Sequence, residues 1–497
     1  MKWLFLIMAI SMVCCGNAAT TWYVTKSGKD TNSGKSESAA FLTIQKAIDS
    51  AAKGDIILVS EGTYDYISVP AAKDALVIRA VGTVTKSVIK GNSGHRCVTV
   101  GAGKTKNVVV AGFTLTGASL SGENYGAGIS GGTCSNCVVR GNTASVRAGG
   151  AYDCILINSE VSDNVARYSV GGIYKCQGVG CVIKGNTSTR YDQGGVTESE
   201  LTDCIVESNV GEMGGGVASS QLTRCVIRNN VRKTSGGGSS SQGFGVHSCT
   251  CTDCLICGNR GPDGGAVSGS SKLYNCTVVD NAAGRADSSS GYTDVIRGGT
   301  FYNCIFGGRS TNSNSNTVFG ATFNKCLLWN AQIHNATQNK STNANPEFAG
   351  VGDYRLKSTS PCINAGDNTY VKSSVDILGN PRVVGGAVDL GAYEWQSAPA
   401  EVKNVIANSR YPWNGKVDLK FTIDGTSGTK YNTSFTARDV VGNTNLTMKT
   451  IYKSNGTAVN VSKEQLTPGT YNWVWNAAAD LGVDAVLDRV VVEVKAE

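Results

Sequence analysis

The residue types that commonly carry chemistry are sparse in this sequence of 497 residues. The three histidines, His95, His247 and His334, lack the mutual spacing of metal ligands, so we interpret them as surface or turn residues. Short Cys-x-x-Cys steps occur, as at Cys134 and Cys137, but they share positions with a cysteine repeat described below. We therefore assign no zinc site and no catalytic residue.

Aspartates recur along the middle of the chain: Asp163, Asp192, Asp203, Asp253 and Asp280. Glycoside hydrolysis needs two carboxylates at a defined separation, and stacking of the segments that carry these residues would bring some of them close. No segment supplies a recurring pair, so we interpret the aspartates as single solvated turn residues.

A second acidic group precedes residue 395 and comprises Asp367, Asp376, Asp389 and Glu394. Two hypotheses stay open for it. The carboxylates hold calcium, which prefers several oxygen ligands, or they make polar contacts that cap the end of a domain. We expect no cofactor and keep calcium as the alternative.

Positioning of these residues depends on a repeat in the middle of the chain. Six segments consist of Cys, two mostly apolar residues, two variable residues and Asn. The cysteines are Cys137, Cys181, Cys204, Cys225, Cys254 and Cys276, and the asparagines are Asn142, Asn186, Asn209, Asn230, Asn259 and Asn281. Weaker copies begin at Cys304 and Cys326, and Ser159 occupies the cysteine position of a further unit. Gly-Gly pairs such as Gly149-Gly150 precede the cysteines.

A unit of about 22 residues is too short for a helical repeat, which takes roughly 33, and its apolar residues alternate as in strands. The repeat predicts one coil of a parallel β-helix with two or three short strands. Stacking places each Cys about 4.8 Å from the next, wider than a disulfide prefers. We interpret most cysteines as small buried hydrophobes. Local pairing stays open for cysteines off this ladder: Cys134, Cys176, Cys249, Cys251 and Cys257.

The asparagines are expected at a turn, where Asn tolerates left-handed backbone angles and its amide can bond to neighbouring coils. Four tyrosines each precede a cysteine by two residues: Tyr152, Tyr174, Tyr274 and Tyr302. Residues two apart in a strand point to the same side. These tyrosines are therefore predicted to lie in the core, with a sugar-binding stripe as the alternative.

The repeat resembles that of right-handed parallel β-helix proteins of the pectin-lyase-like type. It is partly similar to the repeats of chlamydial polymorphic outer-membrane proteins, which typically carry Phe where this chain has Cys. Residues 22–64 are similar to the entry segment of secreted bacterial β-helices, and residues 345–348, 353–368 and 388–395 are similar to their closing segment. The resemblance implies a right-handed parallel β-helix over residues 20–397. The Asp-Asp step and Gly-His-Gly of polygalacturonases, and the Arg-x-Pro-x-x-Arg of pectate lyases, are absent from the sequence.

A short helix is expected before the first coils. Ile44, Ala47, Ile48 and Ala51 have helical spacing, Thr43 can cap the start of the helix and Gly54 can end it. Its apolar face would cover the open end of the β-helix core.

The two ends of the chain differ from the repeat. Residues 1–19 contain Lys2 and the apolar run from Leu4 to Val13, which predicts a secretory signal peptide and an exported protein. No other apolar stretch is long enough for a transmembrane helix. Residues 398–497 lack cysteine and contain alternating strands, as in Val417 to Ile423, which predicts a β-sandwich of the immunoglobulin or fibronectin type.

Composition narrows the function. The net charge of +7 is spread out without a Lys/Arg run, so a nucleic-acid partner is not expected. The sequence favours a secreted or cell-surface protein with a binding, adhesive or structural role towards carbohydrate or a surface protein. Association with a bacterial outer membrane is one possible location. The alternative function is a lyase or hydrolase of acidic polysaccharide, and fold alone does not decide between them.

Overall fold

The computed structural model describes residues 19–101, 106–122, 125–190, 193–212, 214–233, 243–261, 265–283, 294–307, 317–396, 401–409, 415–425, 430–439, 444–482 and 490–496. These residues form two compact units, one ending at Trp395 and the other beginning at Gln396. The expected signal peptide, apart from Ala19, and the expected junction at residues 397–400 lie outside the described residues. Within the described ranges no helix is long and apolar enough to cross a membrane.

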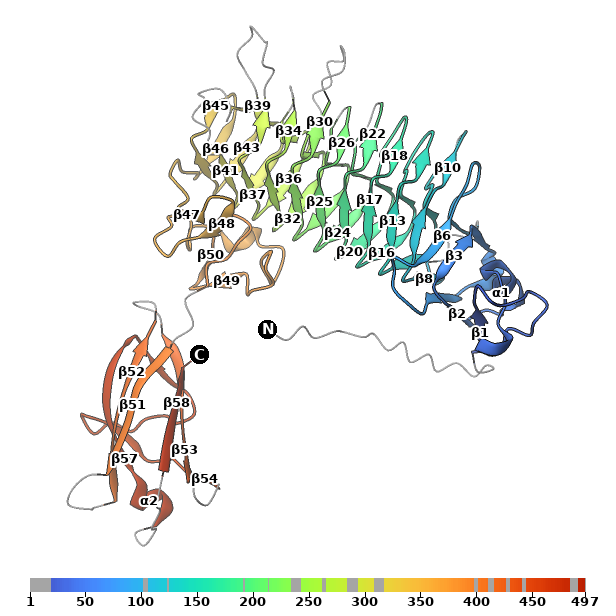
Figure 1. Cartoon of the computed structure of the whole chain (residues 1–497). Coiled ribbons are helices and arrows are strands. Elements are labelled where there is room, and N and C mark those ends of the chain that lie inside the picture. Colours follow the sequence, from blue (N-terminus) through green and yellow to red (C-terminus); the bar gives the residue numbers. More distant parts are fainter. Residues whose placement is uncertain are drawn as a thin grey trace. The chain divides into compact units, whose positions relative to one another are not determined.

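The first unit is a right-handed parallel β-helix (Figure 1). Its strands form four long parallel sheets, each named here by its first strand. The β1 sheet has 14 strands, the β3 and β4 sheets have 12 each, and the β10 sheet has 8. The first strands are β1 (Thr21–Val24), β3 (Gly62–Asp65), β4 (Ile67–Val69) and β10 (Ser119–Leu120). The parallel β-helix expected from the repeat is confirmed, but a full coil has four short strands rather than two or three.

One coil illustrates the arrangement. It comprises β15 (Ala151–Tyr152), β16 (Ile155–Ile157), β17 (Glu160–Ser162) and β18 (Val165–Ala166). Single residues in the left-handed conformation join these strands: Asp153 (φ 51°), Asn158 (φ 46°) and Asp163 (φ 54°). Each is followed by a buried residue, namely Cys154, Ser159 or Asn164. Each of these three corners therefore consists of one left-handed residue and one inward-facing residue with a polar side chain or thiol, whereas residues 167–172, which lead to the next coil, contain no left-handed residue.

The repeat asparagines occupy the inward position of the third corner. From Asn142 to Asn281, with Asn164 in the additional unit, each Nδ2 donates to Oδ1 of the asparagine in the next coil, as in Asn230 to Asn259 at 2.9 Å. The same Oδ1 also accepts the backbone N–H of the previous asparagine, as in Asn209 N to Asn230 Oδ1 at 3.0 Å. The expectation of left-handed angles at these asparagines is wrong, because the preceding residue, such as Asn229 (φ 55°), adopts them.

The repeat cysteines occupy the inward position of the second corner and are fully buried. Their thiols accept backbone N–H groups, as in Cys181 N to Cys204 Sγ at 3.3 Å and Cys225 N to Cys254 Sγ at 3.4 Å. Ser159 Oγ accepts the N–H of Cys137 in the same way, at 3.1 Å. These cysteines therefore act as hydrogen-bond acceptors as well as small apolar groups.

All sixteen cysteines of the described residues are free and buried. The off-ladder positions for which local pairing was left open, such as Cys134 and Cys251, form no disulfide.

The N-terminal end of the core is covered by α1 (Ile44–Ser50), whose N-cap Thr43 accepts the N–H of Lys46 at 3.2 Å. Ile44, Ala47 and Ile48 are buried in the same core as the coils. The helix ends with Ala51 as its C-cap, so Gly54 belongs to the following turn and does not end the helix.

Residues 344–395 form a strap along the flank of the β-helix. It contains β47 (Phe348–Gly350), β48 (Asp353–Leu356), η3 (Asn368–Tyr370), β49 (Val383–Val384) and β50 (Ala387–Val388). Apolar strap residues such as Phe348 and Leu390 pack with Val279, Ile305 and Leu327. The last two belong to the β3 sheet strands β41 (Ile305–Gly307) and β44 (Leu327–Trp329). The strap therefore covers the outer face of later coils of the β3 sheet.

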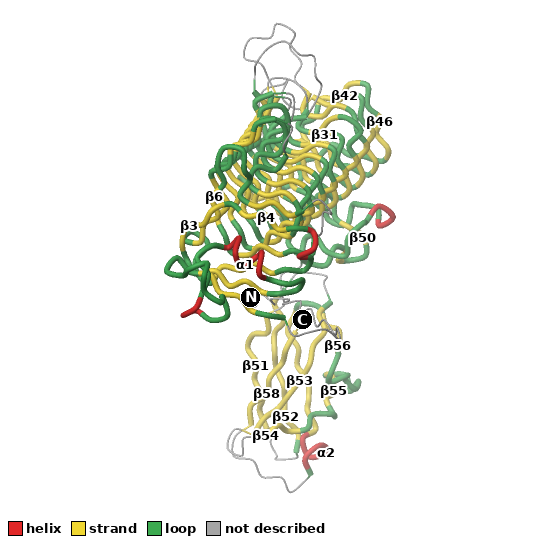
Figure 2. The backbone as a smooth tube through the Cα atoms, turned by 90° about the vertical axis from the view of Figure 1, so that its right-hand side faces the viewer, coloured by secondary structure: helices red, strands yellow, loops and turns green. Residues whose placement is uncertain are grey.

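The second unit is a β-sandwich (Figure 2). One sheet has the order β51 (Glu401–Ser409), β52 (Lys416–Asp424), β57 (Gly469–Asn476), β55 (Ile451–Lys453). The other contains β54 (Thr444–Leu446), β53 (Tyr431–Asp439) and β56 (Glu464–Leu466), and β58 (Val490–Ala496) also pairs with β53. Leu419, Phe421, Ile423, Trp473 and Trp475 form its core. The alternation of these side chains along β52 and β57 matches the sandwich expected from the sequence.

Replacement of Asn230 by alanine is expected to destabilise the β-helix by roughly 2–4 kcal/mol, because it leaves a buried N–H, a carbonyl and two amide groups without partners. The change is measured as the free energy of unfolding in urea. The matched control is Asn339→Ala, since Asn339 donates to Asn324 Oδ1 at 2.9 Å on the exposed surface. Equal losses of unfolding free energy in both variants would show that the buried asparagine ladder does not stabilise the β-helix.

Replacement of Cys204 tests the acceptor role of the thiols. Cys204→Ser keeps an acceptor for the N–H of Cys181, whereas Cys204→Val fills the space without one. We expect the serine variant to be more stable by about 1–2 kcal/mol, although valine is the more apolar residue. Thermal unfolding of both variants checks this order, and a more stable valine variant would assign the cysteines a purely apolar role.

Candidate functional site

The outer face of the β4 sheet carries a continuous row of side chains, called here the outer row. Strand register aligns, coil by coil, Ser130, Tyr152, Tyr174, Thr197, Ala218, His247, Ser268, Arg297, Phe319 and His334. Their preceding neighbours, such as Ile173 and Val196, are fully buried in the core. The strands involved are β11 (Ile129–Ser130), β15, β19 (Ile173–Tyr174), β23 (Val196–Thr197), β27 (Val217–Ala218), β31 (Val246–His247), β35 (Val267–Ser268), β39 (Asp294–Arg297), β42 (Thr317–Phe319) and β45 (Gln332–His334).

The prediction that the tyrosines lie in the core is wrong for Tyr152, Tyr274 and Tyr302, which are half-buried. Tyr174 is buried, at 4 % exposed, but in a small cluster with Ala148 and Val170 outside the β-helix core. Tyr152 and Cys154 are two residues apart, but Asp153 between them is the left-handed corner residue. The corner reverses the alternation, so Cys154 points inward and Tyr152 points outward. The same holds for Tyr174 and Cys176 across Lys175 (φ 56°). The alternative interpretation was a sugar-binding stripe. Such a stripe requires tyrosines outside the β-helix core, and these tyrosines lie outside it.

Part of the outer row forms a tyrosine–arginine cluster, defined here as Tyr125, Arg147, Tyr152, Tyr174, Lys175 and Glu198. Tyr152 stacks on Tyr174 with ring centroids 5.7 Å apart and lies 5.2 Å from Tyr125. The Arg147 guanidinium lies over the rings of Tyr125 and Tyr174, at 5.7 and 5.3 Å from their centroids. Its Nη1 donates to Tyr174 Oη at 2.9 Å, and Tyr174 Oη donates to Glu198 Oε1 at 3.1 Å.

Two further arginines lie on the connections beside this cluster. Arg167 and Arg190 both lie over the ring of Tyr168, with guanidinium carbons 5.1 and 5.9 Å from its centroid. Arg167 and Tyr168 belong to the connection from β18 to β19, one coil after the connection that carries Arg147. Arg147, Arg167 and Arg190 are exposed, and none pairs with a carboxylate within the described ranges.

The protonation of the cluster follows from burial and charge. Burial, together with the bond to Glu198, raises the pKa of the Tyr174 phenol, while Arg147 lowers it. Tyr174 and Glu198 raise the pKa of the Lys175 ammonium. Tyr174 is thus a neutral hydroxyl and Lys175 a cation at physiological pH. The cluster offers cations and hydroxyl donors rather than a phenolate base.

A second tyrosine stack lies on the β1 sheet. Tyr274 and Tyr302 stack at 4.9 Å with an interplanar angle of 7°, and Tyr370 of the strap lies 4.6 Å from Tyr302. Lys372 of the strap lies 5.4 Å from the Tyr274 centroid. Because the rings face one another, this stack mainly joins the strap to the coils.

The recurring aspartates do not meet in one place. Asp203 and Asp253 are left-handed residues of the second corner, whereas Asp163 and Asp280 occupy the third corner. Asp203 pairs with Arg224 at 2.7 Å, and Asp280 accepts a hydrogen bond from Tyr354 at 3.0 Å. Asp192 lies outside the described residues. Interpretation as solvated turn residues is wrong for Asp253, which is 1 % exposed.

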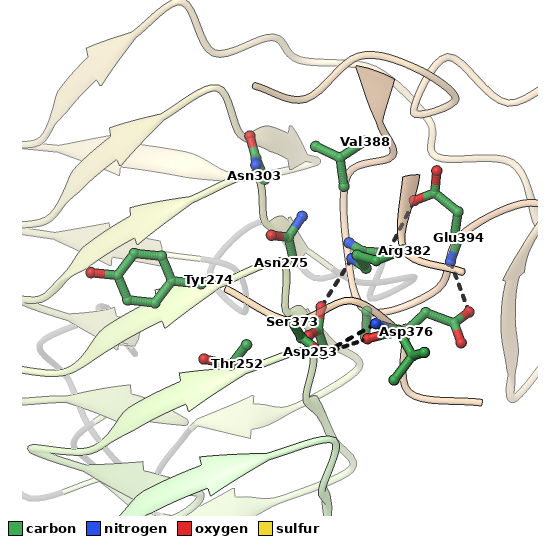
Figure 3. A network of polar contacts seen from close by, with 12 residues as sticks. Thr252, Asp253, Tyr274, Asn275, Asn303, Ser373, Asp376, Arg382, Val388 and Glu394 are labelled. Carbon is green, nitrogen blue, oxygen red and sulfur yellow. Dashed lines mark hydrogen bonds and ion pairs between the residues drawn. The ribbon is translucent and has the colours of Figure 1, made fainter. Parts of the chain in front are cut away.

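Asp253 instead joins the coils to the strap through the buried Arg382 (Figure 3). Arg382 Nε lies 2.9 Å from Asp253 Oδ1 in an ion pair without hydrogen-bond geometry, and its Nη1 donates to Glu394 Oε2 at 3.2 Å. Asp376 and Asp389 accept backbone N–H groups of the strap, including those of Leu378 and Trp395. We call Asp253, Asp376, Arg382, Asp389 and Glu394 the strap network.

The strap network contains four carboxyl groups and one guanidinium. Burial raises the pKa of Asp253 and of Glu394 to about 7, and burial also raises the pKa of Asp389. Asp367, the fourth acid of the expected calcium group, lies apart from the network and caps η3. The acids that were considered for calcium therefore accept hydrogen bonds from the protein itself. No group of potential metal ligands occurs among the residues that the structure describes.

The three histidines lie on the surface and apart from one another in the fold. His95 is exposed and stacks on Tyr66 at 4.1 Å. His247 and His334 belong to the outer row, and His247 Nδ1 lies 2.8 Å from Ser268 Oγ. The outer row was not recognised from the sequence as a site. The sequence does contain a sign of this row. The residue that precedes the first left-handed corner of each coil is aromatic or charged in several coils.

No protein-family model matches the sequence, and no curated protein matches it. Solved structures with similar folds include XylC in complex with xylose, at 9 % identity and a TM-score of 0.36 over 95 % of this chain and 100 % of XylC. A mannuronic acid specific polysaccharide family 6 lyase from human gut microbiota has 10 % sequence identity to this chain and a TM-score of 0.29. The match covers 64 % of this chain and 82 % of the lyase.

Tailspike protein 2 of the Escherichia coli O157:H7 bacteriophage CAB120 gives 10 % identity and a TM-score of 0.20. The match covers 86 % of this chain and 60 % of the tailspike. At these identities and TM-scores the comparisons assign neither a substrate nor an activity to this chain.

The strap network predicts that the first unit is more stable in mild acid. Asp253 and Glu394 keep their protons up to about pH 7 in the folded state, but lose them near pH 4 when unfolded. The free energy of unfolding therefore falls as pH rises from about 4 to 7 and is then level. We expect a loss on the order of 2 kcal/mol between pH 5 and pH 8, measured by urea unfolding.

Asp253→Asn, which imitates the protonated acid, should reduce this pH dependence by about half, because Glu394 still titrates. Asp203→Asn is the matched control at the same corner, because its side chain is 48 % exposed. If the free energy of unfolding changes equally between pH 5 and pH 8 in the wild type and in Asp253→Asn, burial of Asp253 does not cause the pH dependence.

Proposed function

We propose that this protein is an exported β-helix protein that binds acidic polysaccharide along the outer face of the β4 sheet. The observation that carries the proposal is the group of three exposed arginines on neighbouring connections, Arg147, Arg167 and Arg190, held against tyrosine rings without carboxylate partners among the described residues. Some other cations of the coils are neutralised by carboxylates, as Lys184 is by Glu160 and Arg228 by Glu207.

Anionic sugar units fit this face better than neutral ones. A guanidinium forms two parallel hydrogen bonds with a carboxylate, and its position over aromatic rings reduces the entropy lost on binding. Together with Lys175 the named residues supply four cations, against the single carboxylate of Glu198. Successive coils repeat about every 4.8 Å, so the charges are presented along a line, as on an extended polyanion.

Binding without turnover is supported by the chemistry of the cluster. A lyase needs a base near the acidic sugar proton, whereas the raised pKa keeps Tyr174 protonated. A hydrolase needs two carboxyl groups about 5–9.5 Å apart, and the cluster contains one. An adhesive role at a cell surface agrees with the same face. Lyase or hydrolase activity remains the alternative that the experiment below tests.

The expected result is at least ten-fold weaker binding of polygalacturonate by the double variant Arg147→Gln/Arg190→Gln, because two charge-assisted contacts are lost. Isothermal titration at low and high salt measures the affinity, which should fall with salt. Arg79→Gln is the control, since Arg79 is an exposed arginine on β5 (Val77–Ala80) of the β1 sheet. Equal affinity of all three proteins, or equal binding of neutral dextran, would contradict the proposal.

Turnover is followed in the same samples. We expect neither unsaturated products, detected by ultraviolet absorbance, nor new reducing ends from polygalacturonate or alginate, with or without calcium. Sustained release of either product, abolished by changing one acidic or basic residue, would replace the binding function by the enzymatic one.

A further inference from the structure

A depression of about 310 Å³ lies on the outer row, further along the coils than the tyrosine–arginine cluster. It is lined by His247, Gly269, Arg297, Gly298, Phe319 and Gly320. Strand register places these residues on four successive coils, from β31 to β42. The volume is at the lower end of the range for small-molecule sites, and it suits a single sugar ring rather than a protein segment.

The depression exists because of a change at one corner. From Tyr152 to His247 the left-handed residue after the outer row carries a side chain, as in Asp153, Lys175 and Glu198, although Gly131 (φ 78°) occupies this corner after Ser130. In three successive coils that residue is Gly269 (φ 68°), Gly298 (φ 79°) or Gly320 (φ 65°). A Cβ atom on Gly269 would lie 2.9 Å from the His247 ring, and one on Gly320 would meet nothing within 4 Å. Three missing side chains thus open a recess beside the outer row.

The walls of the recess combine three kinds of group. Arg297 is exposed and brings a guanidinium, and Phe319 is 44 % exposed and brings an apolar ring. His247 is held by the contact between its Nδ1 and Ser268 Oγ at 2.8 Å, and Ser268 is fully buried. A cation, an aromatic ring and a polar ring around a backbone floor are complementary to a sugar that carries a carboxylate. The guanidinium would bind the carboxylate, and the aromatic ring would contact the C–H groups of the sugar.

We infer that this recess is a subsite for one uronate residue of a bound acidic polysaccharide. The inference rests on the proposed function and adds a place where the polymer is anchored through a single sugar. His247 follows Tyr174 by three steps of the outer row, through Thr197 and Ala218. At about 4.8 Å a step, the subsite begins roughly 14 Å from the tyrosine–arginine cluster. One extended chain lying along the outer row reaches both.

The experiment uses the full chain and two probes, monomeric D-galacturonate and neutral D-galactose, with binding observed by ligand-detected NMR titration. We expect galacturonate to bind more tightly than galactose. Arg297→Gln should weaken galacturonate binding at least ten-fold, and Arg297→Lys, which keeps the charge but not the forked geometry, should weaken it less.

Gly320→Asn fills the recess without straining the backbone, because asparagine tolerates the left-handed conformation. The next coil has Asn335 at this corner, with φ 48°. We expect this variant to lose galacturonate binding while its melting temperature stays within about 2 °C of wild type. Arg79→Gln is the control that should bind galacturonate as wild type does.

Failure of this inference is distinguishable from failure of the proposed function. Galacturonate binding that is no tighter than that of galactose, or that survives both Arg297→Gln and Gly320→Asn, overturns the subsite. If Arg147→Gln/Arg190→Gln leaves polygalacturonate binding unchanged but Arg297→Gln abolishes galacturonate binding, the subsite stands and the role of the cluster falls. If the cluster variant alone weakens polymer binding and the recess variants have no effect on monomer, the proposed function stands and the subsite falls.

Discussion

The structure depends on how each tight corner satisfies the backbone N–H that follows its left-handed residue. That N–H points towards the core, where an unpaired donor costs about 1–3 kcal/mol. In this chain the side chain at the same position of the next coil accepts it: Cys204 Sγ for Cys181, Ser159 Oγ for Cys137 and Asn230 Oδ1 for Asn209. Cysteine, serine and asparagine share an acceptor close to the backbone. This common need explains why serine replaces cysteine in both cysteine columns, as at Ser159 and Ser199, and why the asparagine column has no apolar member from Asn142 to Asn281.

The same corners determine what the surface can present. Because three corners of a coil each use one left-handed residue, the coils superimpose and each outward position becomes a row. The inward positions are fixed by the acceptor requirement and by packing, whereas the corner residue itself varies: it is exposed in coils such as that of Lys175 and buried in others, as at Asp253. Where it is Lys175 or Glu198 it adds charge beside the tyrosines, and where it is Gly269 or Gly298 it opens a recess. A uniform core therefore supports a binding face whose chemistry changes along the coil axis.

Much of the fold could be predicted from the sequence, because the determining contacts recur at a constant spacing. Cys and Asn columns predict the coil, Thr43 predicts the start of the capping helix, and alternation predicts the strands of the sandwich. The orientation of Tyr152 could not be obtained from alternation, since one left-handed residue reverses it. The residue types before each Cys and Asn, such as Asp153 and Asp163, were the available sign of a corner. The contact of Asp253 with Arg382 depends on a strap that returns to the coils 129 residues later, and no local pattern encodes it.

The position of the strap supports the choice of the β4 sheet as the flank proposed to bind a long ligand. The strap covers later coils of the β3 sheet with Phe348 and Leu390, and its Tyr370 stacks against the β1 sheet at Tyr302. In earlier coils the β3 sheet pairs some of its charges internally, as between Glu160 and Lys184 and between Glu207 and Arg228. The outer row of the β4 sheet has exposed Arg297 and Phe319 beyond the tyrosine–arginine cluster. A polysaccharide that follows the coil axis would therefore meet cations, aromatic rings and a recess on this flank, whereas on the β3 sheet its path would end at the strap. This difference between flanks, rather than the fold itself, is the reason to assign binding to the outer row.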